Sequence, residues 1–227
     1  MATYVAADLN DPSLFFNTVL FTGDGTDDRA ITVGFQPNLS FVLQRTDASG
    51  GYWVDSVRGN NAALQTTNTN QEGTFADMTF TSTGITVSGN ENLNNENAHN
   101  YVSWHWKESA TAGFDIVSYS GSTSSTFTVS HGLSAVPKIF ILKKRSSDGT
   151  NWVMYNANLG NDKRIQLNNT DASADTTGYG DTDPTSSVFT VANGSTTGAD
   201  GQTYIAYCFA EKQGYSKFGS YTGNGNA

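Results

Sequence analysis

The sequence contains one passage twice and begins it a third time, and this repeat restricts the possible folds more than any other feature. The three copies read FNTVLFTG at residues 16–23, FDIVSYSG at 114–121 and YSKFGSYTG at 215–223. The aromatic residues before the glycine turn, Phe21, Tyr119 and Tyr221, are 98 and 102 residues apart. A spacing of about 100 residues is the size of one small domain, so the sequence predicts two complete units and the start of a third.

Further landmarks follow the first strand in the same order in both units. A proline stands eight residues before an arginine, and then come a polar turn, a strand with a tryptophan and a closing aromatic strand. The landmarks are Pro37, Arg45, 46–51, 52–54 and 101–106 in the first unit, and Pro137, Arg145, 146–150, 151–153 and 204–209 in the second. This order indicates internal duplication. The predicted parts are an N-terminal arm at 1–15, units at 16–108 and 109–212, and a C-terminal strand at 213–227.

Short apolar segments between polar turns predict an all-β fold. Only 15% of the residues are charged, and Ser, Thr, Asn and Gly supply most of the polarity, which suits short strands joined by tight turns. Leu39, Phe41 and Leu43 alternate with other residues and so share one face of a strand. The expected strands are 17–22, 30–34, 39–45, 52–57, 75–81, 85–88, 101–106, 115–120, 126–130, 138–145, 151–155, 164–167, 187–192 and 204–211. Their regular spacing is typical of antiparallel β-sandwiches, and no stretch has a sustained helical period.

Two of the expected strands are apolar on both faces. They include residues 139–142 and 205–210, and a strand of this kind is covered on both sides. One face meets the opposing sheet of its own sandwich, and the other meets either unit one or a neighbouring subunit. Ile139 and Ile141 are therefore predicted contact residues at an inter-unit or inter-subunit surface.

The start of the third copy predicts a strand without a unit of its own. A lone strand must satisfy its backbone groups at a sheet edge, which either the same chain or another subunit can offer. Pairing within the chain costs less entropy and is the preferred prediction. The expected contact residues of this strand are Tyr215, Phe218 and Tyr221.

Charge and cysteine content argue against several classes of protein. The net charge is −9, whereas a protein that grips nucleic acid needs a basic surface. The only cationic cluster, at 143–145, ends an apolar strand and is expected at its solvated end. Cys208 is the single cysteine and stands where unit one has His105, which predicts a buried, unreactive thiol without a disulfide. The N-terminus is not a signal peptide and no apolar run reaches about 18 residues, so we expect folding in the cytoplasm without membrane insertion.

No residue pattern predicts a metal, a cofactor or a catalytic site. The three histidines lack the spacing of metal ligands, and no phosphate loop, nucleophile elbow or zinc-protease helix occurs. The acids of 24–28 resemble part of a calcium loop, but the matching residues 121–124 contain none, which favours a plain turn. A carboxylate pair for glycoside cleavage could stand among the 21 acids. No acid-bearing strand recurs in both units, so the sequence predicts a non-enzymatic protein.

The four tryptophans could stack against the apolar faces of sugars. They are Trp53, Trp104, Trp106 and Trp152. All of them lie in strand segments that recur in the two units. Recurrence favours packing in a core over sugar binding.

The landmarks of the second unit resemble a β-rich domain that recurs, often in tandem, in virion proteins of marine bacteriophages. The resembling stretches of the second unit are 113–121, 131–137 with its continuation KIFILKKR, 184–189, 204–211 and 214–223. The first unit matches more loosely, through 55–59 and 101–106. The resemblance covers most of residues 16–227.

The resemblance implies a tail-associated or tail-fibre-type structural protein of a phage particle, acting in assembly and host attachment. Its partners would be other virion proteins, further copies of the same chain and a host surface glycan. The family supplies no catalytic residues to carry over. This chain has two units and no evident shaft, which keeps open a capsid decoration protein. A carbohydrate-binding or carbohydrate-cleaving module is the alternative from another class.

Overall fold

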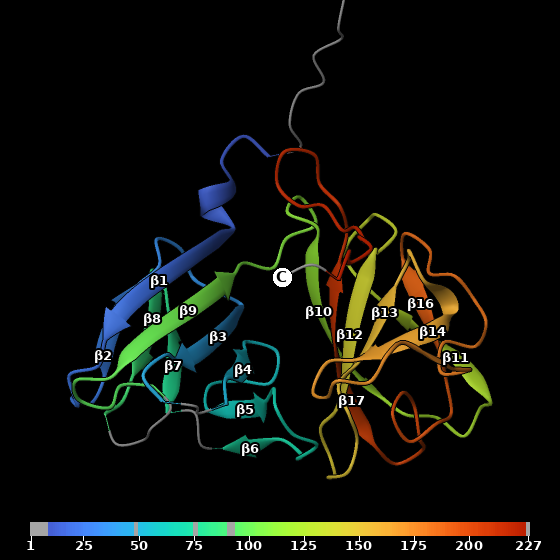
Figure 1. Ribbon diagram of the computed structural model, residues 1–227, viewed down its shortest axis with the longest axis horizontal. Coiled ribbons are helices and arrows are strands. Elements are labelled where there is room, and N and C mark those ends of the chain that lie inside the picture. Colours follow the sequence, from blue (N-terminus) through green and yellow to red (C-terminus); the bar gives the residue numbers. More distant parts are fainter. Residues whose placement is uncertain (1–8, 48–49, 75–76, 90–93, 226–227) are drawn as a thin grey trace, which may run out of the picture.

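The computed structural model describes residues 9–47, 50–74, 77–89 and 94–225. Its sheets are antiparallel, and two units of similar architecture lie side by side (Figure 1). Within these ranges the only helix is the 3₁₀ turn η1 (Pro12–Leu14), so none is long or apolar enough to cross a membrane. Of the predicted N-terminal arm, residues 1–8 lie outside the described residues, and Leu9 is buried.

Unit one is a sandwich of a six-stranded and a three-stranded sheet. The larger sheet has the order β1-β9-β3-β4-β5-β6, and the smaller sheet has the order β2-β8-β7. The strands are β1 (Phe16–Thr22), β2 (Arg29–Thr32), β3 (Leu39–Gln44), β4 (Tyr52–Asp55), β5 (Ala62–Gln65), β6 (Gly73–Thr74), β7 (Met78–Thr81), β8 (Gly84–Val87) and β9 (Asn100–Trp106).

Unit two repeats this plan. Its six-stranded sheet has the order β10-β17-β12-β13-β14-β15, which matches unit one position for position, and β11 pairs with β16 in the second sheet. The strands are β10 (Phe114–Ser120), β11 (Thr126–Ser130), β12 (Ile139–Lys144), β13 (Val153–Asn156), β14 (Gly160–Gln166), β15 (Ala174–Asp175), β16 (Val188–Ala192) and β17 (Thr203–Phe209). The predicted all-β fold of two tandem antiparallel β-sandwich units is confirmed.

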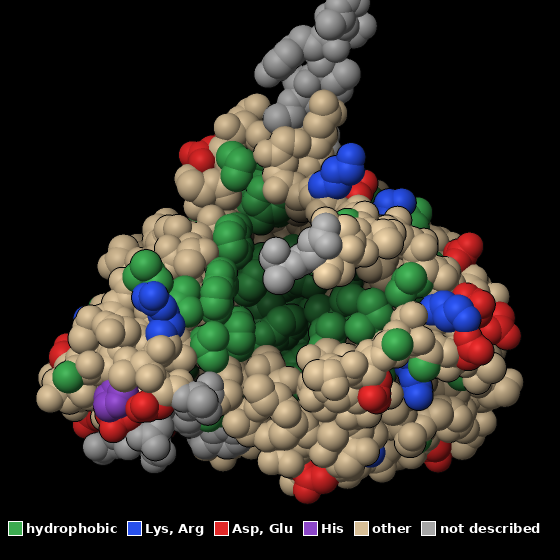
Figure 2. All heavy atoms as spheres, viewed as in Figure 1, with side chains coloured by type: hydrophobic (Ala, Val, Ile, Leu, Met, Phe, Trp, Pro, Cys, Tyr) green, Lys and Arg blue, Asp and Glu red, His purple; other side chains and the backbone are tan. Residues whose placement is uncertain are grey.

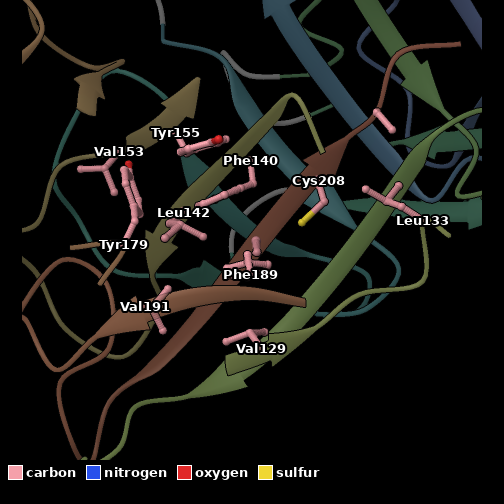
Figure 3. Packing of buried hydrophobic residues seen from close by; sticks show 12 residues of the cluster. Val129, Leu133, Phe140, Leu142, Val153, Tyr155, Tyr179, Phe189, Val191 and Cys208 are labelled. Carbon is pink, nitrogen blue, oxygen red and sulfur yellow. The ribbon is translucent and has the colours of Figure 1, made fainter. Parts of the chain in front are cut away.

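Each unit has its own core between its two sheets. In unit two, Phe140 from the large sheet stacks on Phe189 from the small sheet, with 4.7 Å between ring centroids (Figure 3). Val129 and Val191 close the same core from β11 and β16. In unit one, Ile31, Ile85 and Val87 face Val42, Val54 and Tyr101 in the same way. Each fully buried aliphatic or aromatic side chain contributes about 1.5–3 kcal/mol, so either core is large enough to hold its unit together.

The first strand of each unit pairs with the last strand of the same unit. Phe16 lies opposite Trp106, and Phe114 lies opposite Phe209. The glycine that ends the repeated motif is required by this closure. A Cβ atom on Gly121 would lie 1.8 Å from a backbone oxygen of Ala199.

The equivalent positions of His105 and Cys208 lie inside the two sandwiches. His105 is fully buried, and its ring nitrogens lie 2.8 Å from the hydroxyls of Ser40 and Ser103. Cys208 is also fully buried, opposite Phe140. Burial lowers the pKa of His105 to about 4 and raises the pKa of the Cys208 thiol. The prediction of a buried thiol is therefore confirmed, and the same slot is polar in one unit and apolar in the other.

Several short strands were not predicted. β5, β6 and β15 are absent from the expected set, and β14 begins four residues before the expected strand at 164. β5 begins with two alanines, which have low strand propensity, but its pairing with β4 and burial override this preference. The strand expected at 52–57 ends at Asp55, because the Asp55 carboxylate accepts the backbone N–H groups of Val57 and Arg58 and turns the chain.

The predicted C-terminal strand is corrected by the structure. The described part of the segment, 213–225, forms a turn closed by the isolated bridge between Lys212 and Ser216 and then an irregular stretch. In both units the motif pairs with the closing aromatic strand of its own unit, whereas the described residues 213–225 pair with no strand. Gly223 accordingly has no atom close to where its Cβ would stand, unlike Gly121.

Candidate functional site

The two units meet through the outer faces of their six-stranded sheets, meaning the faces turned away from their own sandwich cores. Leu39 and Leu64 of unit one pack with Ile116, Ile205 and Tyr207 of unit two in one buried cluster. The predicted contact residue Ile141 is 9% exposed within it, and Ile139 packs against it. The second face of the doubly apolar strands therefore lies against unit one.

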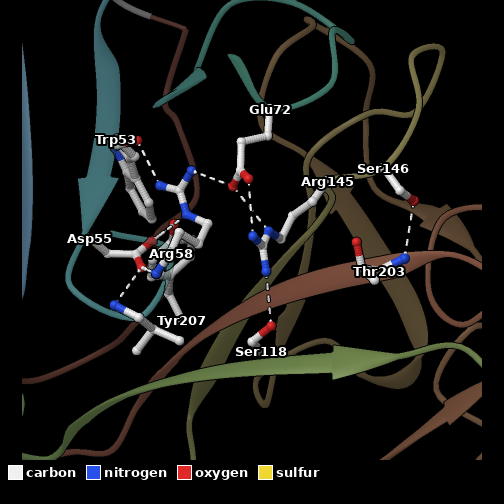
Figure 4. A network of polar contacts seen from close by, with 10 residues as sticks. Trp53, Asp55, Arg58, Glu72, Ser118, Arg145, Ser146, Thr203 and Tyr207 are labelled. Atoms are coloured by element: carbon white, nitrogen blue, oxygen red, sulfur yellow. Dashed lines mark hydrogen bonds and ion pairs between the residues drawn. The ribbon is translucent and has the colours of Figure 1, made fainter. Parts of the chain in front are cut away.

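A buried ion pair of unit one is joined to unit two by a tyrosine (Figure 4). The Arg58 guanidinium donates to Asp55 at 2.5 Å and to the backbone oxygen of Trp53 at 2.7 Å, and both charged side chains are fully buried. Tyr207 of β17 donates its hydroxyl to the same Asp55 carboxylate at 2.7 Å. Burial alone would lower the pKa of Arg58, but Tyr207, Asp55 and Glu72 raise it above its usual value. The Arg58 guanidinium therefore stays charged inside the junction.

Glu72 links a second arginine to this network across the junction. Its carboxylate accepts Arg58 at 3.1 Å and the Arg145 guanidinium of unit two at 2.9 and 3.0 Å. Arg145 also donates to Ser118 on β10. Burial would raise the pKa of Glu72, but the two arginines lower it overall. The carboxylate is thus held ionised between one cation from each unit.

The loop between β5 and β6 lies on the turn between β12 and β13. The Lys143 ammonium donates to the backbone oxygens of Thr69 at 3.1 Å and Thr150 at 2.7 Å, and Trp152 donates its ring N–H to the oxygen of Gln65 at 2.9 Å. Lys143 is fully buried, and burial lowers its pKa to about 8. The expectation that this cationic cluster is solvated was wrong, because Lys143 and Lys144 are buried and Lys143 and Arg145 bond unit one.

Away from this junction, the two outer faces leave a hollow between the units. Figure 2 shows hydrophobic side chains gathered in it. On the unit-one side, a row of cross-strand neighbours runs across the sheet, and it consists of Thr18, Trp104, Phe41, Trp53 and Leu64. The rings of Phe41 and Trp104 stack at 5.1 Å, and Trp53 meets Trp152 of unit two edge to face at 5.3 Å. Each such pair adds about 0.5–1.5 kcal/mol beyond area burial, so the row is a rigid surface.

Two pockets are lined by residues of both units. The aromatic pocket encloses about 490 Å³, and its lining consists of Phe41, Trp53, Thr66, Thr67, Trp152, Leu167, Asn168, Asn169 and Thr170. The C-terminal pocket encloses about 300 Å³, and its lining consists of Phe16, Trp106, Ala112, Gly113, Phe114, Phe209, Tyr215, Ser216 and Phe218.

The four tryptophans are not sandwich-core residues. Trp152 is 2% exposed in the inter-unit cluster, and Trp53, Trp104 and Trp106 are half-buried on the outer face of unit one. Trp152 packs in the cluster between the units and Trp53 and Trp106 pack against it, so these three do pack in a core, and the expectation was wrong for Trp104. Neither the alternation of a strand nor the repeat states which face is turned inward, so packing inside a sandwich could not be told from packing between the units.

The three predicted contact residues of the C-terminal segment are placed differently. Tyr215 and Phe218 are half-buried and line the C-terminal pocket, where Phe218 contacts the ring of Phe209 at 6.3 Å. Tyr221 is 95% exposed. The segment is therefore docked up to Phe218 and free of the protein surface at Tyr221.

The carboxylates that could support catalysis or metal binding are not among the lining residues of either pocket. Burial, together with a hydrogen bond and the charge of Asp115, raises the pKa of Glu108 to about 7. Asp115 accepts the backbone N–H of Gly132 at 2.7 Å. Asp24 of the calcium-like turn accepts Thr26 and Asn95 and pairs with Arg29 at 3.3 Å. In the part of the chain that is described, no three His, Cys, Asp or Glu side chains converge as metal ligands would.

Asp55, Arg58 and Glu72 of the junction, and Phe41 and Asn169 of the aromatic pocket, were not predicted. A partial signal existed for three of them. Asp55 and Arg58 are three residues apart beside a turn, and Phe41 shares a face with two apolar neighbours. Glu72 and Arg145 are 73 positions apart, and Asp55 and Tyr207 are 152 positions apart, so only the assembled units reveal the sites.

No curated protein and no solved structure matches the chain. One family model, described as a domain of unknown function (DUF7483), matches residues 11–227. The match spans both sandwich units, the junction between them and the C-terminal segment. The chain therefore belongs to the DUF7483 domain family.

Proposed function

We propose that this protein is a non-enzymatic structural protein of a bacteriophage particle, tail-associated or of tail-fibre type, that acts by binding in particle assembly and host attachment. The resemblance of its repeated motifs to phage virion domains supports a location on a phage particle. The fixed inter-unit geometry supports binding. Several copies on one particle would raise the strength of attachment by multivalency.

The observation that carries this proposal is a pre-formed aromatic surface between two locked units. The buried Asp55–Arg58 pair, Tyr207 and Glu72 fix the units from one side of the junction, and Phe41 and Trp53 remain accessible beside it. A ligand that binds a pre-formed surface loses little free energy to ordering it. The lining of the aromatic pocket carries no carboxylate, imidazole or thiol, which supports binding over turnover.

The experiment is to locate and count the protein on purified phage particles. Antibody labelling in electron microscopy should place it on the tail, with few copies per particle by quantitative mass spectrometry. The purified protein should also bind host cells and compete with phage adsorption. Labelling over the whole capsid would instead establish the decoration protein. Release of reducing sugar from host polysaccharide would overturn the non-enzymatic proposal.

A further inference from the structure

The lining of the aromatic pocket is divided into an apolar floor and a polar rim. Rings of Phe41, Trp53 and Trp152 belong to sheet faces and form the floor. The rim comes from two loops, one after β5 and one after β14, and it carries Thr66, Thr67, Asn168, Asn169 and Thr170. The volume of about 490 Å³ lies within the range of about 300–1,000 Å³ for small-ligand sites. A ligand that fills this pocket needs one apolar face and an edge of hydrogen-bonding groups.

The rim offers polar groups that the fold does not use. Among the described residues, no hydrogen bond engages the hydroxyls of Thr67 and Thr170. Asn169 is exposed, and its amide N–H groups donate to Gln166 at the end of β14 and to Asp171. Its amide oxygen accepts the backbone N–H of Asp171 and keeps one lone pair for a ligand. Asn168 differs, because it holds the backbone of Trp152 at 2.8 Å and so fixes the floor. Hydroxyls and amides that both donate and accept suit a ligand rich in hydroxyl groups.

The charge of the site excludes an anionic ligand. None of the nine lining residues is charged, and the chain as a whole carries −9. The charged residue that follows the rim, Asp171, is a carboxylate, and Asn169 contacts it at 2.9 Å. The negative charge would repel an acidic ligand, and no lining residue is a cation that could pair with it. An uncharged ligand is not repelled.

The floor is a sheet face, which argues against an extended peptide. Peptides added to β-proteins take their backbone hydrogen bonds from a sheet edge. Phe41 lies on β3 and Trp53 on β4, and both strands are paired on each side in the six-stranded sheet. Their backbone groups are therefore already used, and only side chains meet the ligand.

We propose that the aromatic pocket is a binding site for an uncharged glycan, a proposal that rests on the proposed binding function and names its ligand class. The apolar face of a pyranose ring packs on Phe41 and Trp53, because its C–H groups meet the negative faces of the aromatic rings. The ring hydroxyls bond Thr67, Asn169 and Thr170 at the rim. Leu167, which is 43% exposed, covers the apolar edge of the sugar.

The test is binding of the full chain to a printed array of neutral and acidic glycans, followed by titration of the bound glycans. Trp53 and Trp152 lie in the pocket, so their fluorescence reports occupancy. We expect saturable binding confined to neutral glycans. The double variant Leu167→Ala/Asn169→Ala should weaken that binding at least tenfold.

The chain offers a matched control for this variant. Asn158 and Leu159 are an exposed Asn–Leu pair on the turn between β13 and β14, outside the lining of the aromatic pocket. The variant Asn158→Ala/Leu159→Ala removes the same two side chains there and should bind as the unaltered protein does. Both variants change exposed residues, and equal unfolding midpoints would show that folding is intact.

Three outcomes would overturn the glycan site. They are a lack of binding to every neutral glycan of the array, stronger binding to acidic glycans, and equal weakening by the two double variants. The proposed function fails separately. If the protein labels phage tails and binds host cells equally well with and without Leu167→Ala/Asn169→Ala, attachment stands and the glycan site falls. If glycans bind but virions lack the protein, the glycan site stands and the virion role falls.

Discussion

His105 and Cys208 occupy equivalent positions in the two units, but different contacts accommodate the two buried side chains. His105 lies among Ser40 and Ser103, so its two ring nitrogens are satisfied inside unit one. Cys208 lies opposite Phe140 in an apolar core. A buried polar group must keep its partners, whereas a thiol needs none. The repeat identified the shared position, and the serines that bond the histidine lie on the same face of the sheet, Ser40 directly opposite His105 and Ser103 two residues before it.

Replacing His105 by Gln should reduce the pH dependence of stability. The pKa of His105 is about 4 in the folded protein, below its ordinary value of 6.5, so only the unfolded chain binds the proton between these two values. Stability therefore falls as the pH is lowered from about 6.5 to about 4, by about 3 kcal/mol for this residue. Urea unfolding at several pH values should show this loss in the unaltered protein and not in His105→Gln. A His99→Gln control, at a partly exposed histidine outside the sandwich core, should retain it.

At the scale of elements, strong local patterns predicted strands and weak ones did not. The long apolar strands β12 and β17 were expected from sequence, whereas β5 depends on its pairing with β4 despite its two alanines. The C-terminal motif shows the opposite failure. Its sequence repeats that of β1 and β10, but a strand needs a neighbour to bond its backbone groups, and the described residues 213–225 pair with no strand.

Truncation should separate the docked and exposed halves of the C-terminal segment. Ending the chain after Phe218 removes exposed residues and should change the free energy of unfolding by less than about 0.5 kcal/mol. Ending it after Glu211 also removes Tyr215 and Phe218 from their pocket and should cost about 2 kcal/mol. Urea unfolding measures both. Equal unfolding midpoints for the two truncations would contradict the docking of Tyr215 and Phe218. If the truncation after Phe218 is already enough to abolish self-association, the segment donates a strand to another copy.

At the scale of the whole molecule, the junction determines both stability and the candidate site. The duplication and the two sandwiches were predicted from the repeat. The angle between them was not, because it depends on contacts such as Tyr207 with Asp55 and Arg145 with Glu72 that join distant positions. The hollow and its aromatic floor exist only at that angle, so the candidate site could not be located from the sequence.

The locked junction should make the two units unfold together, in one transition. Arg58→Met removes the cation that pairs with the buried Asp55 carboxylate, and an unpaired buried charge costs about 3–5 kcal/mol. Lys163→Met breaks an exposed ion pair with Asp175 and should leave the midpoint nearly unchanged. Urea unfolding followed by circular dichroism compares them. Two separate transitions in the unaltered protein, or equal effects of the two substitutions, would show that the junction does not couple the unfolding of the two units.

The pairing of first and last strands also determines how each unit resists a pulling force. Phe16 lies opposite Trp106 and Thr22 opposite Asn100, so both ends of unit one leave the same end of an antiparallel pair. Tension between these ends opens the pair one hydrogen bond at a time, as a zipper opens, instead of shearing all bonds together. The same holds for Phe114 and Phe209 in unit two. Each sandwich alone therefore opens at low force when it is pulled from its two ends. The contacts between the units are where the protein can resist such a force.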